Sequence, residues 1–188
     1  KGGVGKTTTA INLAAGLVAQ KQRVLLVDLD PQGNATMGSG VNKAELENSV
    51  YQVLIGTALA SQALLHASAA GYSVLPANRD LAGAEVELVD LDNREMRLKL
   101  ALNEIEEQFD FILIDCPPAL SLLTLNGLCA ADGVVVPMQC EYFALEGLSD
   151  LVNTIKQVHA NLNPGLKIIG LLRVMFDARV TLQQQVSE

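Results

Sequence analysis

Short apolar segments alternate with helical patterns along the chain, and this alternation constrains the fold more than any other feature. The apolar segments span residues 23–28, 72–76, 109–115, 133–138 and 167–174. Helical patterns lie at residues 8–20, 45–55, 59–67, 82–91, 94–108, 121–131, 144–161 and 181–188. Strands that are apolar throughout are typical of a parallel sheet covered on both faces. The order therefore predicts an α/β fold, with a doubly wound, mostly parallel sheet and helices on both faces.

The length and composition suit one domain with a large apolar core. The chain has 188 residues, of which 49% are hydrophobic and 18% charged, and its mean hydropathy is +0.28. A chain of this size can bury a sizeable core as one unit, so we expect a single domain over residues 1–188. Residues 1–9 begin inside a motif and residues 181–188 begin a helix. We therefore expect this domain to be truncated at both ends.

Cysteine use and charge narrow the class of protein. Cys116, Cys129 and Cys140 are odd in number, widely spaced and outside any CxxC motif, which disfavours disulfide and zinc scaffolds and favours a cytoplasmic protein. No apolar run approaches the roughly 18 residues of a membrane span, so no membrane partner is expected. The net charge of −8 argues against a surface covered with phosphate contacts, and the lack of Trp argues against base stacking as the main activity.

The first nine residues, KGGVGKTTT, match most of a phosphate-binding loop, G-x-x-x-x-G-K-[ST]. Lys6 is expected to reach the β- and γ-phosphates of a nucleotide, and the Thr7 hydroxyl to bind Mg²⁺. The residues expected to contact the nucleotide here are Gly2, Gly3, Val4, Gly5, Lys6, Thr7 and Thr8. A glycine-rich turn before a helix is the simpler alternative. Such a loop needs a preceding strand to aim its N–H groups at the phosphates, so we expect the sheet's central first strand to be missing from this chain. We also expect the isolated chain of 188 residues to be poorly stable.

Two further segments place carboxylates at the ends of predicted strands. In DLDPQGN, Asp28 and Asp30 follow the strand at residues 23–28, at the edge where ligands bind in parallel sheets. We expect one of them to support Mg²⁺ through water and the other to orient an attacking water, the alternative being a simple turn. In FILIDCPP, four apolar residues precede Asp115, which is expected to hold Mg²⁺ directly or through water, the alternative being a buried strand with a capping Asp.

These segments together resemble the deviant Walker A P-loop ATPases of the MinD/ParA superfamily, and the ParA/Soj partitioning ATPases in particular. The resemblance rests on KGGVGKTT, DLDPQGN and FILIDCPP, and on VPMQCEYFALEGL and GLLRVMFDAR nearer the end of the chain. These five motifs stand in the family's order and extend over essentially the whole chain. The resemblance therefore implies a P-loop NTPase fold and an ATPase that uses ATP and Mg²⁺.

The resemblance also assigns roles to single residues. Lys1, which would otherwise be read as a solvated lysine, matches the family's signature lysine, which crosses a dimer interface to the partner's phosphates. Lys6 matches the Walker lysine, and Asp30 matches the aspartate of switch I that hydrolysis needs. These assignments imply catalytic roles for Lys1, Lys6 and Asp30, metal binding by Thr7, Asp30 and Asp115, and a position near the adenine for Met175, Phe176 and Asp177.

The partners implied by the resemblance are a second copy of the chain, DNA and an activator. ATP would drive a sandwich dimer that binds DNA non-specifically, and a ParB-type activator would stimulate hydrolysis and release. The protein would then be cytoplasmic, and nucleoid-associated in its ATP state. No basic stripe is visible in the sequence, because Arg94, Arg97 and Lys99 are interleaved with or followed by glutamates. DNA binding is therefore implied by the resemblance alone.

Three alternatives stay open from the sequence. The first is a MinD-like ATPase that cycles on membranes, although DPQGN disfavours it. The second is a metabolic or redox member of the superfamily, such as a cobyrinate-amidating enzyme or a nitrogenase iron protein, and the cysteine pattern disfavours the iron protein. The third is a nucleotide-binding scaffold without turnover, which the intact Lys1, Lys6, Asp30 and Asp115 disfavour.

Overall fold

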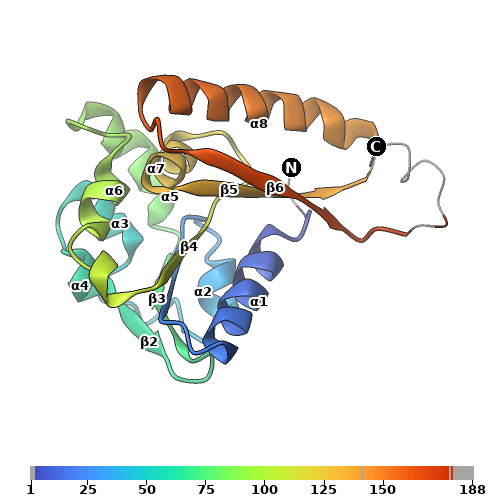
Figure 1. Ribbon diagram of the computed structural model, residues 1–188. Coiled ribbons are helices and arrows are strands. Elements are labelled where there is room, and N and C mark those ends of the chain that lie inside the picture. The colour runs from blue at the N-terminus through green and yellow to red at the C-terminus, as the bar shows by residue number, and fades with distance from the viewer. Residues whose placement is uncertain (1–2, 141, 178, 180–188) are drawn as a thin grey trace.

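Two β-sheets form the centre of the computed structural model, which describes residues 3–140, 142–177 and 179 (Figure 1). The strands are β1 (Val24–Asp28), β2 (Leu65–Ala67), β3 (Tyr72–Leu75), β4 (Phe111–Asp115), β5 (Gly133–Gln139) and β6 (Lys167–Val174). The first sheet has the order β2-β3-β1-β4, and the second pairs β5 with β6. All neighbouring strands are parallel except β2, which runs antiparallel to β3 at the edge.

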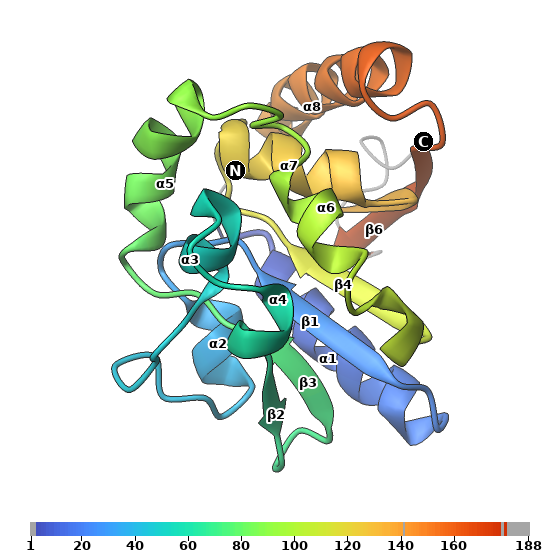
Figure 2. The same ribbon diagram turned by 90° about the vertical axis from the view of Figure 1, so that its left-hand side faces the viewer.

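Helices cover both faces of the four-stranded sheet. The helices of the described residues are α1 (Lys6–Ala19), α2 (Asn34–Gly38), α3 (Val50–Ile55), α4 (Ala60–Ala63), α5 (Leu81–Glu87), α6 (Arg97–Leu102), α7 (Leu122–Ala130) and α8 (Tyr142–Asn161), with 3₁₀ helices at Leu88–Asp90 and Glu106–Gln108. Helices α3 to α7 pack on one face and α1 and α2 on the other, so that in Figure 2 α3 and α4 lie in front of the sheet and α1 lies behind it. Helix α8 lies along the β5–β6 pair and packs against α7 (Figure 1). The predicted α/β fold with helices on both faces is confirmed.

Strand β1 lies at the centre of this packing, and all five of its residues are buried. Leu25 and Val27 belong to the apolar cluster shared with α3 to α7. Val24 and Leu26 belong to the cluster shared with α1 and α2. Because successive side chains of a strand point to opposite faces, Asp28 shares the face of Val24 and Leu26 and points toward α1 and α2.

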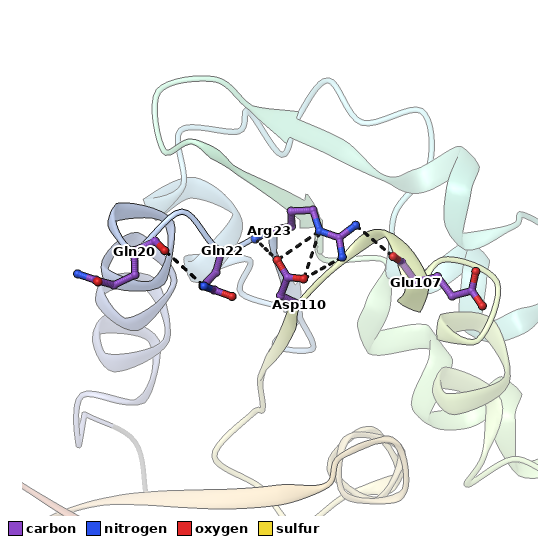
Figure 3. A network of polar contacts seen from close by, with 5 residues as sticks. All are labelled: Gln20, Gln22, Arg23, Glu107 and Asp110. Atoms are coloured by element: carbon purple, nitrogen blue, oxygen red, sulfur yellow. Dashed lines mark hydrogen bonds and ion pairs between the residues drawn. The ribbon is translucent and has the colours of Figure 1, made fainter.

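An exposed ion pair joins the amino ends of β1 and β4 (Figure 3). The Asp110 carboxylate accepts hydrogen bonds from the backbone N–H and from Nη2 of Arg23, each at 2.8 Å. The Arg23 carbonyl in turn accepts from the backbone N–H groups of Asp110 and Phe111, at 2.8 and 3.2 Å. A further bond runs from the guanidinium to the Glu107 carbonyl at 3.2 Å. These contacts fix where the pairing of β1 with β4 begins.

The β1–β4 pairing continues in register along both strands. Val24 lies opposite Phe111 at one end, and Asp28 lies opposite Asp115 at the other. Since side chains of directly paired residues on neighbouring strands lie on the same face, Asp115 points to the same side of the sheet as Asp28. The register therefore places two buried carboxylates next to each other at the carboxyl edge, on the side that carries α1 and α2.

A cavity of about 1160 Å³ lies between the two sheets. Its wall includes residues of β4 and β5 and apolar side chains of α1, among them Leu13 and Leu17. Within the described part of the chain, β4 and β5 each pair along one edge only. An extended segment between them would meet unpaired backbone groups on both sides. The cavity therefore separates the four-stranded sheet from the β5–β6 pair.

Several segments differ from the expected elements because capping and tertiary pairing outweigh local helical pattern. The expected loop at residues 29–43 contains helix α2, and the expected helix at residues 45–55 begins only after Ser49, whose side chain caps α3. The expected helix at residues 59–67 divides into α4 and strand β2, which pairs with β3. The pattern at residues 94–108 forms only α6 and a 3₁₀ turn. The helix expected at residues 181–188 lies outside the described residues.

Glycine at position 127 lets α7 approach the carboxyl ends of β1 and β4. A Cβ added to Gly127 would lie 2.7 Å from Cys116 Sγ and 3.2 Å from Leu29 Cδ1. We therefore expect Gly127→Ala to lower the free energy of unfolding by about 1–3 kcal/mol, although alanine favours helix. The measurement is denaturant unfolding followed by circular dichroism.

Gly16→Ala is the matched control for this substitution. Gly16 is also inside a helix, but a Cβ added there meets nothing within 4 Å. Helix propensity alone then acts, and the substitution should raise the free energy of unfolding by roughly 0.5–1 kcal/mol. Equal effects of the two substitutions would show that the close approach at Gly127 has no energetic consequence.

Candidate active site

The described part of the phosphate loop has the backbone that a phosphate site needs. Gly3 and Gly5 have φ values of 78° and 76°, in the left-handed region that glycine adopts without steric cost. Helix α1 begins at Lys6, and no side chain in the described residues caps its amino end. Uncapped N–H groups and the helix dipole at such an end favour binding of phosphate oxygens. The loop and the start of α1 therefore form a candidate anion site.

Thr7 and Asp115 meet at the start of α1, although 108 positions separate them in sequence. Thr7 Oγ1 donates a hydrogen bond to Asp115 Oδ2 at 2.7 Å. Asp115 is 3% exposed, and the positive charge of Lys6 acts on it. A hydroxyl beside a carboxylate supplies the oxygen ligands that Mg²⁺ prefers, so the residues present fit this ion. The structure thus brings together Lys6, Thr7 and Asp115, three of the predicted site residues.

The environment of Asp115 disfavours its negative charge. Burial raises the pKa of Asp115 to about 6. The bond from Thr7 and the charge of Lys6 oppose this shift, whereas the neighbouring carboxylates of Asp28 and Asp30 add to it. A bound cation would stabilise the ionised carboxylate and remove this cost.

Asp28 has a different role from the one expected. It is fully buried, and its two oxygens accept hydrogen bonds from the backbone N–H of Asp30 and from the N–H and hydroxyl of Thr36. Burial raises its pKa, and these hydrogen bonds oppose the shift. The prediction that Asp28 acts on Mg²⁺ or on a water is therefore corrected, because the alternation of β1 directs its side chain to the start of α2.

Asp30 forms the turn that was the simpler alternative, and it also lies close to the site. Its Oδ1 accepts from the backbone N–H of Gln32 at 2.9 Å, and its carbonyl accepts from Gly33 at 2.8 Å. The side chain is only half-buried, and its charge acts on Asp115. The turn therefore keeps the Asp30 carboxylate close enough for its charge to act on Asp115.

The segment expected near the adenine follows β6 and lies near the phosphate loop. A Cβ added at Gly5 would lie 3.8 Å from Cγ1 of Val174, the last residue of β6. Met175 has a φ of 52°, in the left-handed region, and its sulfur accepts a hydrogen bond from Gln139 Nε2 at 3.0 Å. The Arg173 guanidinium lies 4.5 Å from the centre of the Phe176 ring. The chain thus turns sharply beside the loop, and Asp177 bonds to Arg179.

The remaining predicted nucleotide contacts divide into two groups. Val4 is buried against the cavity, and Thr8 is exposed on the first turn of α1. Lys1 and Gly2 lie outside the described residues, so their predicted roles stay predictions.

Sequence reasoning missed the residues that hold the loop at residues 28–36 in place. A Cβ added at Gly33, whose φ is 63°, would lie 2.7 Å from the Ala77 carbonyl oxygen. Lys43 Nζ donates to the Gln32 carbonyl at 2.6 Å, and the Thr36 hydroxyl accepts from the Ala77 N–H at 2.9 Å. The glycine in DPQGN was the available signal, but its distant partner could be known only from the fold.

Comparison with known proteins gives the family. A family model described as an AAA domain matches residues 1–168. The chromosome partitioning protein ParA of Myxococcus xanthus is 54% identical over 189 residues, which cover 100% of this chain and 66% of that protein. The sporulation initiation inhibitor protein Soj of Bacillus subtilis is 53% identical over 188 residues, covering 100% of this chain and 74% of that protein. The chain belongs to the ParA/Soj family of partitioning ATPases.

Similar solved structures contain bound nucleotide and magnesium. The crystal structure of cobyrinic acid a,c-diamide synthase from Mycobacterium smegmatis with bound ADP and magnesium has a TM-score of 0.95 and 47% identity. The match covers 100% of this chain and 76% of that one, and a second structure of the same protein holds an ATP analogue and magnesium. The prediction of ATP and Mg²⁺ as cofactors is thus confirmed for this ParA/Soj-related fold.

The raised pKa of Asp115 predicts a pH-dependent effect of Asp115→Asn on this ParA/Soj chain. Without nucleotide and metal, the folded carboxyl has a pKa of about 6 against an ordinary value of 3.8. The folded state then binds the proton more tightly, so the contribution of Asp115 to stability falls as the pH rises from about 4 to 6 and stays low above that. Asp115→Asn should therefore raise the free energy of unfolding at pH 7 by up to about 3 kcal/mol.

Below pH 4 the gain from Asp115→Asn should largely disappear, because the carboxyl is then neutral in the folded state. Denaturant unfolding of both proteins in EDTA at pH 4, 5, 6 and 7 measures this. If Asp115→Asn lowered the free energy of unfolding equally at pH 7 and at pH 4, the buried environment assigned to Asp115 would be contradicted.

Proposed function

We propose that this ParA/Soj chain is the ATP-hydrolysing domain of a DNA-partitioning ATPase. The observation that carries the proposal is the Thr7–Asp115 hydrogen bond of 2.7 Å, which lies at the start of α1 immediately after the phosphate loop. A phosphate loop whose threonine meets a strand-end aspartate is the arrangement that binds Mg²⁺ with nucleoside triphosphates. Family membership and the nucleotide-bound relative support the same proposal.

In this proposal each residue at the site has a defined task. The N–H groups of Gly3 to Thr7 and the side chain of Lys6 hold the β- and γ-phosphates. Thr7 and Asp115 hold Mg²⁺, which would neutralise charge on the phosphates, and Asp30 orients the attacking water and assists metal binding through water. Met175, Phe176 and Asp177 lie beside the adenine. The reaction is transfer of the γ-phosphoryl group to water, giving ADP and phosphate.

Dimerisation belongs to the proposal through Lys1. By family resemblance Lys1 reaches the phosphates bound by a second copy of the chain, so that hydrolysis depends on an ATP-bound sandwich dimer. A second cation supplied by the partner would make the γ-phosphate the group that holds the dimer together, and its loss would release the two copies. A ParB-type activator would set the time of that release.

Binding of the dimer to non-specific DNA rests on family membership, because the described surface gives it no support. Arg94 pairs with Glu95 at 2.9 Å, and Arg97 donates to the Leu54 carbonyl. The expected solvated helix face over Arg94, Arg97 and Lys99 is not formed as a unit, because α6 begins only at Arg97 and the Arg97 bond is partly buried. We propose a cytoplasmic protein that joins the nucleoid in its ATP state.

Nucleotide-dependent binding to duplex DNA tests this function. The full-length protein and its Lys6→Ala variant are titrated onto a non-specific duplex with ATP, with ADP and without nucleotide, at two salt concentrations. We expect binding only with ATP, weaker binding at the higher salt because phosphate contacts release counterions, and no binding by Lys6→Ala. ATP hydrolysis without DNA binding in any nucleotide state would contradict the partitioning function, while the proposed ATPase activity would still stand.

Amidation is a second candidate, favoured by the 47% identity to cobyrinic acid a,c-diamide synthase. Incubation of the protein with cobyrinic acid, ATP and an ammonia source, followed by mass spectrometry, distinguishes the two. Amide formation would replace the partitioning function. A membrane-cycling function has no such support, and no helix among the described residues is long and apolar enough to span a bilayer.

A further inference from the structure

Asp28 is a buried carboxylate whose hydrogen bonds all go to one loop. Its Oδ1 accepts from the backbone N–H of Asp30 at 3.0 Å. Its Oδ2 accepts from both the backbone N–H and the hydroxyl of Thr36, each at 2.8 Å. The side chain therefore holds the beginning and the end of residues 30–36 from a single point at the tip of β1.

The Thr36 hydroxyl connects this point to a second strand. It donates to Asp28 and accepts from the backbone N–H of Ala77 at 2.9 Å, just after β3. Both Thr36 and Ala77 are fully buried, so no water replaces either bond. The hydroxyl thus joins the carboxyl ends of β1 and β3 through the first turn of α2, and both of its hydrogen-bonding functions are used.

Contacts at Gly33 and Lys43 close the same loop from its outer side. Gly33 is pressed against the Ala77 carbonyl, and Lys43 holds the Gln32 carbonyl. Asp30 differs from these neighbours, because its side chain is half-buried and accepts a hydrogen bond from Gln32 within its own turn. The loop is therefore fixed on both sides of a carboxylate whose charge acts on Asp115.

We propose that Asp28 and Thr36 are positioning residues, which fix the loop so that the Asp30 carboxylate is held beside the Thr7–Asp115 pair. This inference rests on the proposed ATP hydrolysis. In this proposal both residues act through the loop and neither is assigned a contact with the nucleotide. Loss of their bonds should move Asp30 while leaving the phosphate loop intact, and a displacement of about 1 Å can lower a rate by about 100-fold.

Thr36→Val removes the hydroxyl and keeps the shape of the side chain. We expect kcat for ATP hydrolysis to fall by about 10- to 100-fold, while the Kd for ATP changes less than about twofold. Thr36→Ser restores the hydroxyl and should return kcat to within about threefold of the starting protein. Asp28→Asn should behave like Thr36→Val, because an amide has only one acceptor oxygen for three donors on two sides.

Ser39→Ala is the matched control. Ser39 ends the same helix, is 3% exposed, and bonds to the Ala35 carbonyl and to the Tyr72 hydroxyl without touching Asp28. Its loss should lower the melting temperature as Thr36→Val does, but leave kcat unchanged. Equal losses of kcat in Thr36→Val and Ser39→Ala would overturn the positioning role. A loss of ATP affinity in Thr36→Val as large as its loss of kcat would also overturn it.

Amide hydrogen exchange separates this inference from the proposed function. Thr36→Val should speed exchange at residues 30–36 by at least about tenfold, whereas Ser39→Ala should not. Unchanged exchange in Thr36→Val would overturn the inference even if the protein is an active ATPase. Faster exchange in Thr36→Val, combined with no ATP hydrolysis by the starting protein, would support the loop contact. It would overturn both the proposed function and the catalytic role assigned to the loop.

Discussion

The parallel register between β1 and β4 places Asp28 directly opposite Asp115 at the carboxyl edge of the sheet. A shift of one residue would turn one of these carboxylates to the opposite face. In the observed register both point toward α1 and α2, where each meets a threonine, Thr7 for Asp115 and Thr36 for Asp28. Two paired carboxylates thus acquire different tasks, since Thr7 lies in the first turn of the helix after the phosphate loop and Thr36 lies in the first turn of α2, which begins at the end of the DPQGN segment.

Most of the fold could be predicted from the sequence, because its strands are apolar throughout. Burial of every residue of β1 agrees with the pattern that predicted a covered parallel sheet. The prediction was wrong where a short segment had helical spacing but a strand partner in space. Leu65–Ala67 pairs with β3, and this contact decides the conformation of a segment too short to hold a helix by itself.

The site could be predicted where a motif carries its own chemistry. The structure brings Thr7 and Asp115 together, as the two motifs suggested, whereas the roles of Lys6, Thr7 and Asp115 toward phosphate and Mg²⁺ stay predictions. The surroundings of Asp28 could not be predicted, since spacing alone cannot tell whether Asp28 or Asp30 will be fully buried. Thr36, the partner of Asp28, lies 8 positions away in sequence, and Ala77, which donates to the Thr36 hydroxyl, lies 41 positions beyond Thr36. Only the pairing of β1 with β3 brings the three residues together.

The division of tasks between Asp115 and Asp28 is the central claim, and a crystal structure of the full-length protein with Mg²⁺ and a non-hydrolysable ATP analogue tests it most directly. We expect the Thr7 hydroxyl to leave Asp115 and bind the metal, with Asp115 on the metal or on one of its waters. Asp28 should keep its bonds to Thr36 and to the Asp30 N–H. A structure in which Asp28 turns to the metal, or in which Thr7 stays bonded to Asp115 with the metal bound elsewhere, would contradict the account.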